Sequence, residues 1–127
     1  MSRSSRGRGV LIDTDVLVDH LRGARRLRLP RAVAWISVVT RAELFSGASA
    51  EESEQKGLAA LLSIFDEIEV NRAIAERGGR IRRLTGVPLP DSLIAASALE
   101  RGLVVMTRNQ RHFARVDGIT LHDPDAS

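Results

Sequence analysis

The segment "VLIDTDVLVD", from Val10 to Asp19, places three aspartates in an otherwise apolar run. Its opening "VLID" predicts a short buried strand that ends at Asp13, because it is apolar and rich in β-branched side chains up to that residue. The residues that follow predict a helix closed by Gly23. Carboxylates rarely lie in a protein core unless they are paired or bind a metal. The aspartates of this segment therefore require a partner from elsewhere in the chain.

The alternation of short apolar strands with helices continues along the chain. Further strands are expected at 32–39, 66–70, 103–106 and 118–121, and helices at 40–48, 53–65, 72–84 and 91–102. This order specifies an α/β domain with a mostly parallel, twisted sheet and right-handed crossovers. Ligands of such sheets bind just outside the carboxyl ends of the strands.

Several helix starts carry capping signals. Thr40 and Glu43 have the spacing of a capping box, and Ser49 and Glu52 repeat it. Asn71 is expected to cap the helix over 72–84. One face of that helix is expected to be apolar and buried: Ile74, Gly78, Ile81 and Leu84.

Length and composition limit the class of protein. The chain has 127 residues, which favours one domain, and it contains no cysteine, which excludes disulfides and thiolate metal sites. No apolar run approaches the length of a membrane span, and Asp13 and Asp15 interrupt the segment where a signal peptide would be apolar. We therefore expect a cytoplasmic protein with residues 1–9 as a disordered basic arm, residues 10–123 as the folded domain and 124–127 as a tail.

Arginine supplies nearly all of the positive charge. The net charge is +3, the sequence pI is about 10.8, and Lys56 is the only lysine. Arginine suits phosphate recognition because its planar fork binds phosphate oxygens in a bidentate way. A genome that prefers arginine codons explains the same bias equally well. Arg108 and Arg111 flank Asn109 in the sequence and are candidate contacts for the phosphates of a nucleic acid.

Four oxygen-bearing side chains fall near the expected carboxyl edge of the sheet. Asp13 ends the first strand, Glu43 lies in the first helical turn after the second, Asp91 opens an apolar helix, and Asn109 follows the strand at 103–106. Taken singly, each has an ordinary explanation as a turn or capping residue. Together they predict a site for a hard divalent cation, since bare carboxylates repel one another and magnesium or manganese prefers oxygen ligands. Cleavage of phosphodiesters uses such sites.

Four stretches resemble the motif blocks of PIN-domain ribonucleases, and most closely those of VapC toxins. They are "VLIDTDVLVDHLRG", "SVVTRAELFSGA", "LPDSLIAASALERGL" and "VVMTRNQRHF", and the resemblance runs from about Val10 to His122. It implies a three-layer α/β/α domain and a magnesium- or manganese-dependent endoribonuclease that acts as the toxin of a toxin–antitoxin pair. It also implies a homodimer and a VapB-type antitoxin whose tail blocks the site.

The resemblance also implies roles for particular residues. It maps the family's acidic metal ligands onto Asp13, Glu43 and Asp91, while the fourth acidic position falls on Asn109, which offers a carbonyl oxygen without charge. The hydroxyl residues Thr14 and Thr107 are placed beside the metal, and Asp15 is expected to support a ligand or a water. Asp19 lies on the far side of its helix by 3.6-residue periodicity and is expected to be structural or at the surface.

Three alternatives compete with the nuclease interpretation. "VLIDTDVL" resembles the D-x-D signature of haloacid dehalogenase-type phosphatases, with Asp13 as nucleophile, but Leu17 and the absence of a suitable late lysine disfavour it. A phospho-accepting receiver domain would need adjacent acids after the first strand. A PIN-like RNA-binding module with weak or no catalysis is suggested by Asn109.

Overall fold

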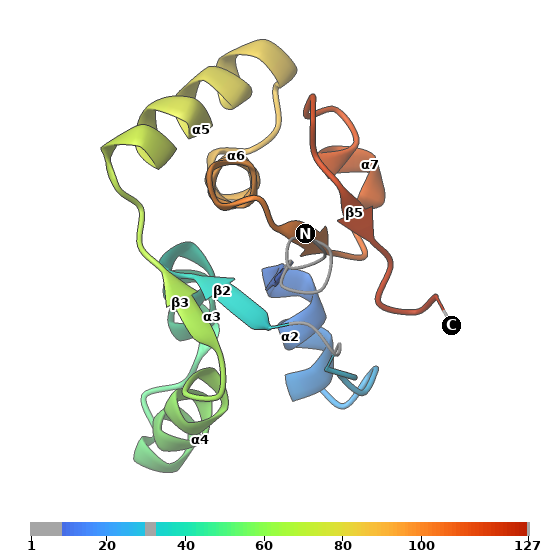
Figure 1. Cartoon of the computed structure of the whole chain (residues 1–127). Coiled ribbons are helices and arrows are strands. Elements are labelled where there is room, and N and C mark those ends of the chain that lie inside the picture. The colour runs from blue at the N-terminus through green and yellow to red at the C-terminus, as the bar shows by residue number, and fades with distance from the viewer. Residues whose placement is uncertain (1–8, 30–32, 127) are drawn as a thin grey trace.

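The fold is built on a parallel sheet whose centre is the strand quoted above. The computed structural model describes residues 9–29 and 33–126, so the basic arm expected at residues 1–9 lies outside it except for Gly9. In these residues the five strands run in the order β3-β2-β1-β4-β5 (Figure 1). Their bounds are β1 Val10–Ile12, β2 Ala34–Ser37, β3 Asp66–Ile68, β4 Val104–Met106 and β5 Leu121–His122. Every strand pair is parallel, which confirms and sharpens the expected sheet.

The order of the strands creates a switch point beside β1. The chain moves from β1 outward to β2 and β3, and then returns to the other side of β1 to form β4 and β5. Ile12 pairs with Met106 at the carboxyl end of the two central strands. Connections leave a doubly wound sheet in opposite directions at such a point, and ligands bind in the crevice that this opens.

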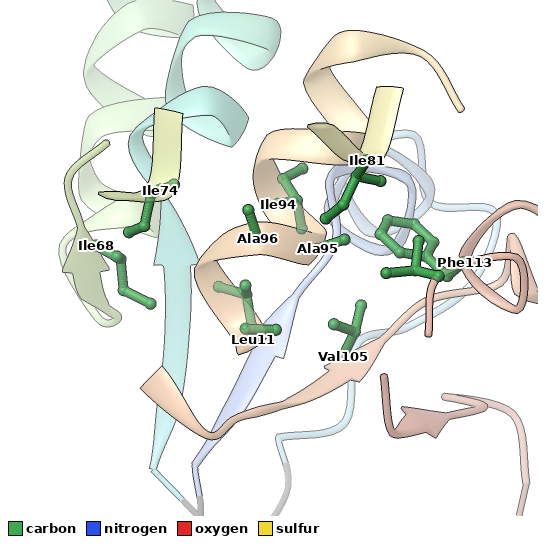
Figure 2. Packing of buried hydrophobic residues seen from close by; sticks show 11 residues of the cluster. Leu11, Ile68, Ile74, Ile81, Ile94, Ala95, Ala96, Val105 and Phe113 are labelled. Atoms are coloured by element: carbon green, nitrogen blue, oxygen red, sulfur yellow. The ribbon is translucent and has the colours of Figure 1, made fainter. Parts of the chain in front are cut away.

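Helices cover both faces of the sheet, so the domain has three layers. The helices are α2 Thr14–Leu21, α3 Val38–Gly47, α4 Glu52–Leu62, α5 Arg72–Thr85, α6 Leu89–Arg101 and α7 Gln110–Phe113. One buried cluster joins Leu11 and Val105 of the strands to α5, α6 and α7, as Figure 2 shows. A second cluster joins Ile12 and Ile36 to α2, α3 and α4. Alternate residues of β1 thus face opposite layers, as the period of a strand requires.

Close packing of α5 on α6 explains a glycine that weakens an isolated helix. A Cβ built on Gly78 would lie 2.6 Å from Leu93 Cδ2, whereas one on Gly79 would meet nothing within 4 Å. Gly78 therefore lets the two helices approach. The expected buried face of α5 is confirmed for Ile74, Gly78 and Ile81, but Leu84 is 76% exposed because it lies in the last turn, beyond this contact.

Two local expectations at the junction of β2 and α3 were wrong. The strand expected at 32–39 ends at Ser37, which caps α3 by accepting a hydrogen bond from Val39 N–H at 3.0 Å. The capping box of Thr40 and Glu43 therefore does not exist: Thr40 is buried within α3, and Glu43 lies in its second turn. Val38 and Val39 are half-buried in the first turn of α3, and the cap at Ser37 overrides their preference for strands.

The second expected box also fails, and the last strand is shifted. Glu51 occupies the cap position of α4 without a side-chain bond, while Ser49 N–H donates to Glu54 at 3.0 Å. The strand expected at 118–121 is found at Leu121–His122. Asn71 caps α5 as expected, accepting from Ile74 N–H at 2.9 Å. Within the described part of the chain, no helix combines the length and apolar character that a membrane span requires.

Candidate active site

Asp13 lies at the carboxyl end of β1 and is almost wholly buried, with 3% of its surface exposed. Its backbone N–H donates to Met106 O of β4 at 2.9 Å, which fixes it at the switch point. Its Oδ1 accepts from Thr14 N–H at 2.9 Å, and its Oδ2 accepts from the Thr107 hydroxyl at 2.8 Å. Both oxygens keep a second lone pair for another partner.

Asp15 follows Asp13 by two residues, in the first turn of α2, and both side chains line the same pocket. Its Oδ2 accepts from Arg108 N–H at 3.2 Å and lies 3.4 Å from the Thr107 hydroxyl. Its Oδ1 is buried and has no hydrogen-bond partner among the described residues. A buried polar atom without a partner is costly, which indicates that a ligand belongs there.

The electrostatics of these acids show an excess of negative charge. Burial, and then the charges of Asp15 and Asp91, raise the pKa of Asp13 to about 8, against the opposing hydrogen bonds from Thr107 and Thr14. Burial also raises the pKa of Asp15, although Arg108 opposes this. The fold therefore holds carboxyl groups that do not ionise easily unless a cation joins them.

The Thr14 side chain connects the segment that carries Asp13 and Asp15, just after β1, to Glu43 of α3. The Thr14 hydroxyl donates to Glu43 Oε1 at 2.6 Å and lies 3.0 Å from the Thr40 hydroxyl, whose residue is buried in α3. Glu43 is half-buried, and its side chain points from α3 toward the start of α2. The sequence placed Thr14 beside the site only by resemblance, and this contact gives the placement a physical basis.

Asp91, Asn109 and His112 meet on the other side of the site. Asp91 lies in the first turn of α6, and its Oδ2 is 3.4 Å from His112 Nδ1. That ring nitrogen is also 2.8 Å from Asn109 Nδ2. Asn109 Oδ1 caps α7, accepting from His112 N–H at 3.4 Å, so its carbonyl oxygen is directed at a helix end. His112 belongs to no metal-binding spacing in the sequence, so no signal short of the tertiary structure identifies it.

The predicted side chains share one open pocket of about 400 Å³. Its lining contains Asp13, Glu43, Asp91 and Asn109 together with Thr14 and Asp15. The structure thus brings together the residues that the strand ends suggested. The pocket lies at the carboxyl edge of β1 and β4, where the topology places a ligand.

The donor set fits a hard cation in part. Its oxygens are carboxylates, with one buried oxygen that has no partner, as magnesium or manganese prefers. No three His, Asp or Glu side chains in the described ranges are arranged to hold a metal ion by themselves. Magnesium usually keeps several waters and binds one or two carboxylates, so this set suits a hydrated ion better than a closed protein cage.

One expectation at the rim was wrong. Asp19 lines the same pocket and accepts a hydrogen bond from Arg108 Nη1 at 3.0 Å, so it faces the site. Arg108, a candidate phosphate contact, pairs with Asp19 and Asp125 in this structure, and its side chain is only 13% exposed. Arg111 is exposed on α7 and does not line the pocket.

The fold and the site together define an α/β domain that carries an acidic pocket at the switch point of a doubly wound parallel sheet, where such sheets bind ligands. A family model described as PIN domain matches residues 10–119. The chain is 30% identical over 126 residues to a tRNA(fMet)-specific endonuclease VapC of Shigella flexneri, covering 89% of this chain and 96% of that protein. It is 36% identical over 116 residues to Ribonuclease VapC19 of Mycobacterium tuberculosis, covering 81% and 90%.

The structural comparison agrees. A toxin–antitoxin complex from Klebsiella pneumoniae contains a chain that matches with a TM-score of 0.72 and 33% identity, covering 91% of this chain and 97% of that one. The chain therefore belongs to the PIN-domain family and, within it, to the VapC ribonucleases. This membership decides against the phosphatase and receiver-domain alternatives.

Proposed function

We propose that this protein is the toxin of a VapBC pair and hydrolyses RNA phosphodiester bonds with the help of magnesium or manganese. One observation carries the proposal: Asp13 is buried at the switch point beside Asp15, whose Oδ1 has no partner in the described structure. If these side chains only filled space in the core, apolar residues would do so without the free-energy cost of burying a carboxyl group. A pocket that gathers acids and leaves one oxygen unpaired is suited to a cation and a phosphate.

Asp13, Glu43 and Asp91 are the residues that would hold the ion, and we add Asp15 through Oδ1. When bound, such an ion lowers the pKa of a water molecule and neutralises charge on the phosphate under attack. The protein holds these oxygens in place by hydrogen bonds. Thr107 anchors Asp13, Arg108 N–H anchors Asp15, and Thr14 anchors Glu43.

Asp91 and His112 form the remaining wall of the pocket. Asn109 keeps the His112 ring in position through its amide, with 2.8 Å between Nδ2 and Nδ1. This ring in turn lies against Asp91 Oδ2. We infer that Asn109 acts by positioning these groups, because its carbonyl oxygen serves the cap of α7.

The names of the relatives extend the proposal to substrate and partners. One relative is described as specific for tRNA(fMet), and one structural neighbour is a toxin–antitoxin complex. We propose that the substrate is an RNA and that a VapB-type antitoxin binds the chain. A homodimer is also proposed, and light scattering on the purified protein tests it.

The test is incubation of the purified protein with structured RNA in magnesium, manganese or EDTA. Asp13→Asn is the variant of interest, and Asp117→Asn, which removes one exposed charge away from the pocket, is the matched control. We expect cleavage with metal by the wild type and the control, and none by Asp13→Asn or in EDTA. Cleavage that survives EDTA or Asp13→Asn contradicts the mechanism.

A second candidate function is RNA binding with weak catalysis, which the capping role of Asn109 favours. This candidate predicts that the wild type binds RNA without metal and cleaves it far more slowly than the Asn109→Asp variant does. If both forms cleave at the same rate, this candidate is rejected. Release of phosphate from a phosphomonoester would instead indicate a phosphatase.

A further inference from the structure

The C-terminal tail, residues 123–126, is held against two arginines beside the pocket. Asp125 accepts from Arg108 Nε at 2.9 Å through Oδ2 and from Arg108 Nη2 at 3.1 Å through Oδ1. Asp125 also pairs with Arg25, which lies on the loop after α2. In Figure 1 the chain runs from β5 back toward this loop. One carboxylate thus joins two arginines that are far apart in sequence.

The geometry of this contact is that of an arginine bound to a phosphate. Two parallel N–H groups of one guanidinium reach the two oxygens of one anion, which is the bidentate arrangement that arginine uses for carboxylates and phosphates alike. Asp19 holds the remaining Nη1 at 3.0 Å, so the outward edge of the guanidinium is the one that faces Asp125. The Arg108 hydrogen bond also holds the pKa of the Asp125 carboxyl below its ordinary value.

Arg108 is connected to the active site by its neighbours in sequence and in space, and Arg25 is connected to it through the shared carboxylate of Asp125. Arg108 follows Thr107, the residue that anchors Asp13, and its own N–H anchors Asp15. Asp19, which orients its guanidinium, lines the catalytic pocket. An RNA strand whose reacting phosphate lies in the pocket would therefore bring a neighbouring phosphate to this edge.

The tail reaches the two arginines through a short turn of its own. Asp125 N–H donates to Asp123 Oδ1 at 2.9 Å, and Ala126 N–H donates to Asp123 O at 3.1 Å, so a short local turn presents Asp125. The Asp125 side chain is 41% exposed, and that of Arg25 is 56% exposed. The Asp125–Arg25 pair is exposed, and such pairs contribute little net stability because water and salt screen them. The bidentate pair with Arg108, whose side chain is 13% exposed, is the stronger contact, and a polyanion competes for it by offering the same two-oxygen geometry with more charge.

We propose that Arg108 and Arg25 form a phosphate subsite for the RNA backbone, and that Asp125 occupies this subsite as an internal competitor. The inference rests on the proposed ribonuclease function for the identity of the ligand. It explains why Arg108 is engaged in the RNA-free chain although its place in the fold is beside the pocket. It assigns a regulatory role to the tail: RNA binds only after the tail has left.

The experiment measures binding of a short single-stranded RNA, in EDTA, to the full-length protein. Asp125→Asn removes the competing charge, and Asp117→Asn makes the same change of net charge at a distant exposed position. We expect Asp125→Asn to bind RNA about three- to tenfold more tightly, the range for release of a modest internal competitor. The slope of the logarithm of the binding constant against the logarithm of the salt concentration should steepen by roughly 0.7 for each additional phosphate contact to single-stranded RNA. Asp117→Asn should show neither effect.

Two further variants identify the groups responsible. A chain that ends at Pro124 should reproduce the gain, and Arg25→Gln combined with Asp125→Asn should lose part of it. Thermal denaturation checks that each variant is folded. Equal affinity of Asp125→Asn and wild type, or an equal gain in Asp117→Asn, overturns the inference.

A parallel titration with tripolyphosphate separates this inference from the ribonuclease proposal. If the wild type fails to cleave RNA with metal, the ribonuclease proposal fails, but tighter tripolyphosphate binding by Asp125→Asn still supports the phosphate subsite. If the wild type cleaves RNA and Asp125→Asn binds neither probe more tightly, only the subsite is rejected.

Discussion

The ionisation of Asp13 should control both the stability of the metal-free protein and its affinity for metal. Its pKa rises from the ordinary 3.8 to about 8 in the fold, mainly because it is buried. That shift corresponds to a penalty on the order of 5 kcal/mol against the ionised form when no cation is bound. Between these two values the folded state holds a proton that the unfolded state has lost. The free energy of unfolding should therefore fall as pH rises, by roughly 1 kcal/mol per pH unit, and level off above pH 8.

The assay is chemical denaturation in EDTA from pH 5 to pH 9, with Asp13→Asn as the comparison. The neutral amide cannot ionise, so this variant lacks the penalty while keeping the size of the side chain. Near pH 5 Asp13→Asn should already be more stable by about 1–2 kcal/mol, and the difference should grow to roughly 5 kcal/mol above pH 8. Comparing the two at each pH cancels the titration of groups distant from Asp13, and the remaining difference reports Asp13 together with the two carboxyl groups that interact with it, Asp15 and Asp91.

Bound metal should reverse this order of stability between the wild type and Asp13→Asn. Because the ion competes with a proton at Asp13, the apparent affinity of the protein for the ion should rise with pH up to about 8, by at most about tenfold per pH unit. Binding of the ion below this pH should release a proton from Asp13. Saturating manganese should then stabilise the wild type and leave Asp13→Asn nearly unchanged. A stability difference between the two metal-free proteins that stays constant from pH 5 to pH 9 would falsify the burial argument.

Three further predictions follow from single contacts. Thr107→Val removes the hydroxyl that donates to the buried aspartate and accepts from Asn109 N–H. It should cost about 1–3 kcal/mol in denaturation and lower the rate of RNA cleavage, and unchanged values would mean that water replaces the hydroxyl. Gly78→Ala should destabilise by about 1–3 kcal/mol because its methyl would overlap Leu93, whereas Gly79→Ala should stabilise by up to about 1 kcal/mol. Equal effects of the two alanines on the melting temperature would refute the close packing of α5 on α6. Asn109→Asp should keep the cap of α7 and tighten manganese binding measured by calorimetry, since it adds a charge at the pocket; weaker binding would contradict this.

The positions of the acids could be inferred from the sequence because strand ends are strong local signals. Asp13 follows an apolar β-branched run, and Asn109 follows another, so a parallel arrangement of the two strands predicts that both lie at one edge, as the pocket lining confirms. Capping signals were less reliable. Asn71 was identified correctly, but Ser37 caps α3 in place of Thr40, and the cap position of α4 belongs to Glu51, which makes no side-chain bond, in place of Ser49. Short polar residues close together in sequence compete for one helix end, and tertiary packing selects among them.

Contacts between residues distant in sequence were outside the reach of pattern reasoning. His112 carries no motif, and only the juxtaposition of α6 and α7 shows that it touches Asp91. Asp19 was assigned to the far side of α2 by helical period alone, yet it faces the pocket because Asp13 is the cap rather than a residue of the helix. Arg108 could be placed near the site, but its engagement by Asp125 depends on where the chain ends in space.

The sequence by itself determined the α/β class, the acids at the strand ends and the chemistry that oxygen ligands favour, because apolar periodicity and residue type are local properties. The tertiary structure alone decided the ionisation of Asp13, the missing partner of Asp15 Oδ1 and the contact of the tail with Arg108. Those properties depend on burial and on the distances between charges, and both arise only when the strands pair and the helices close over them.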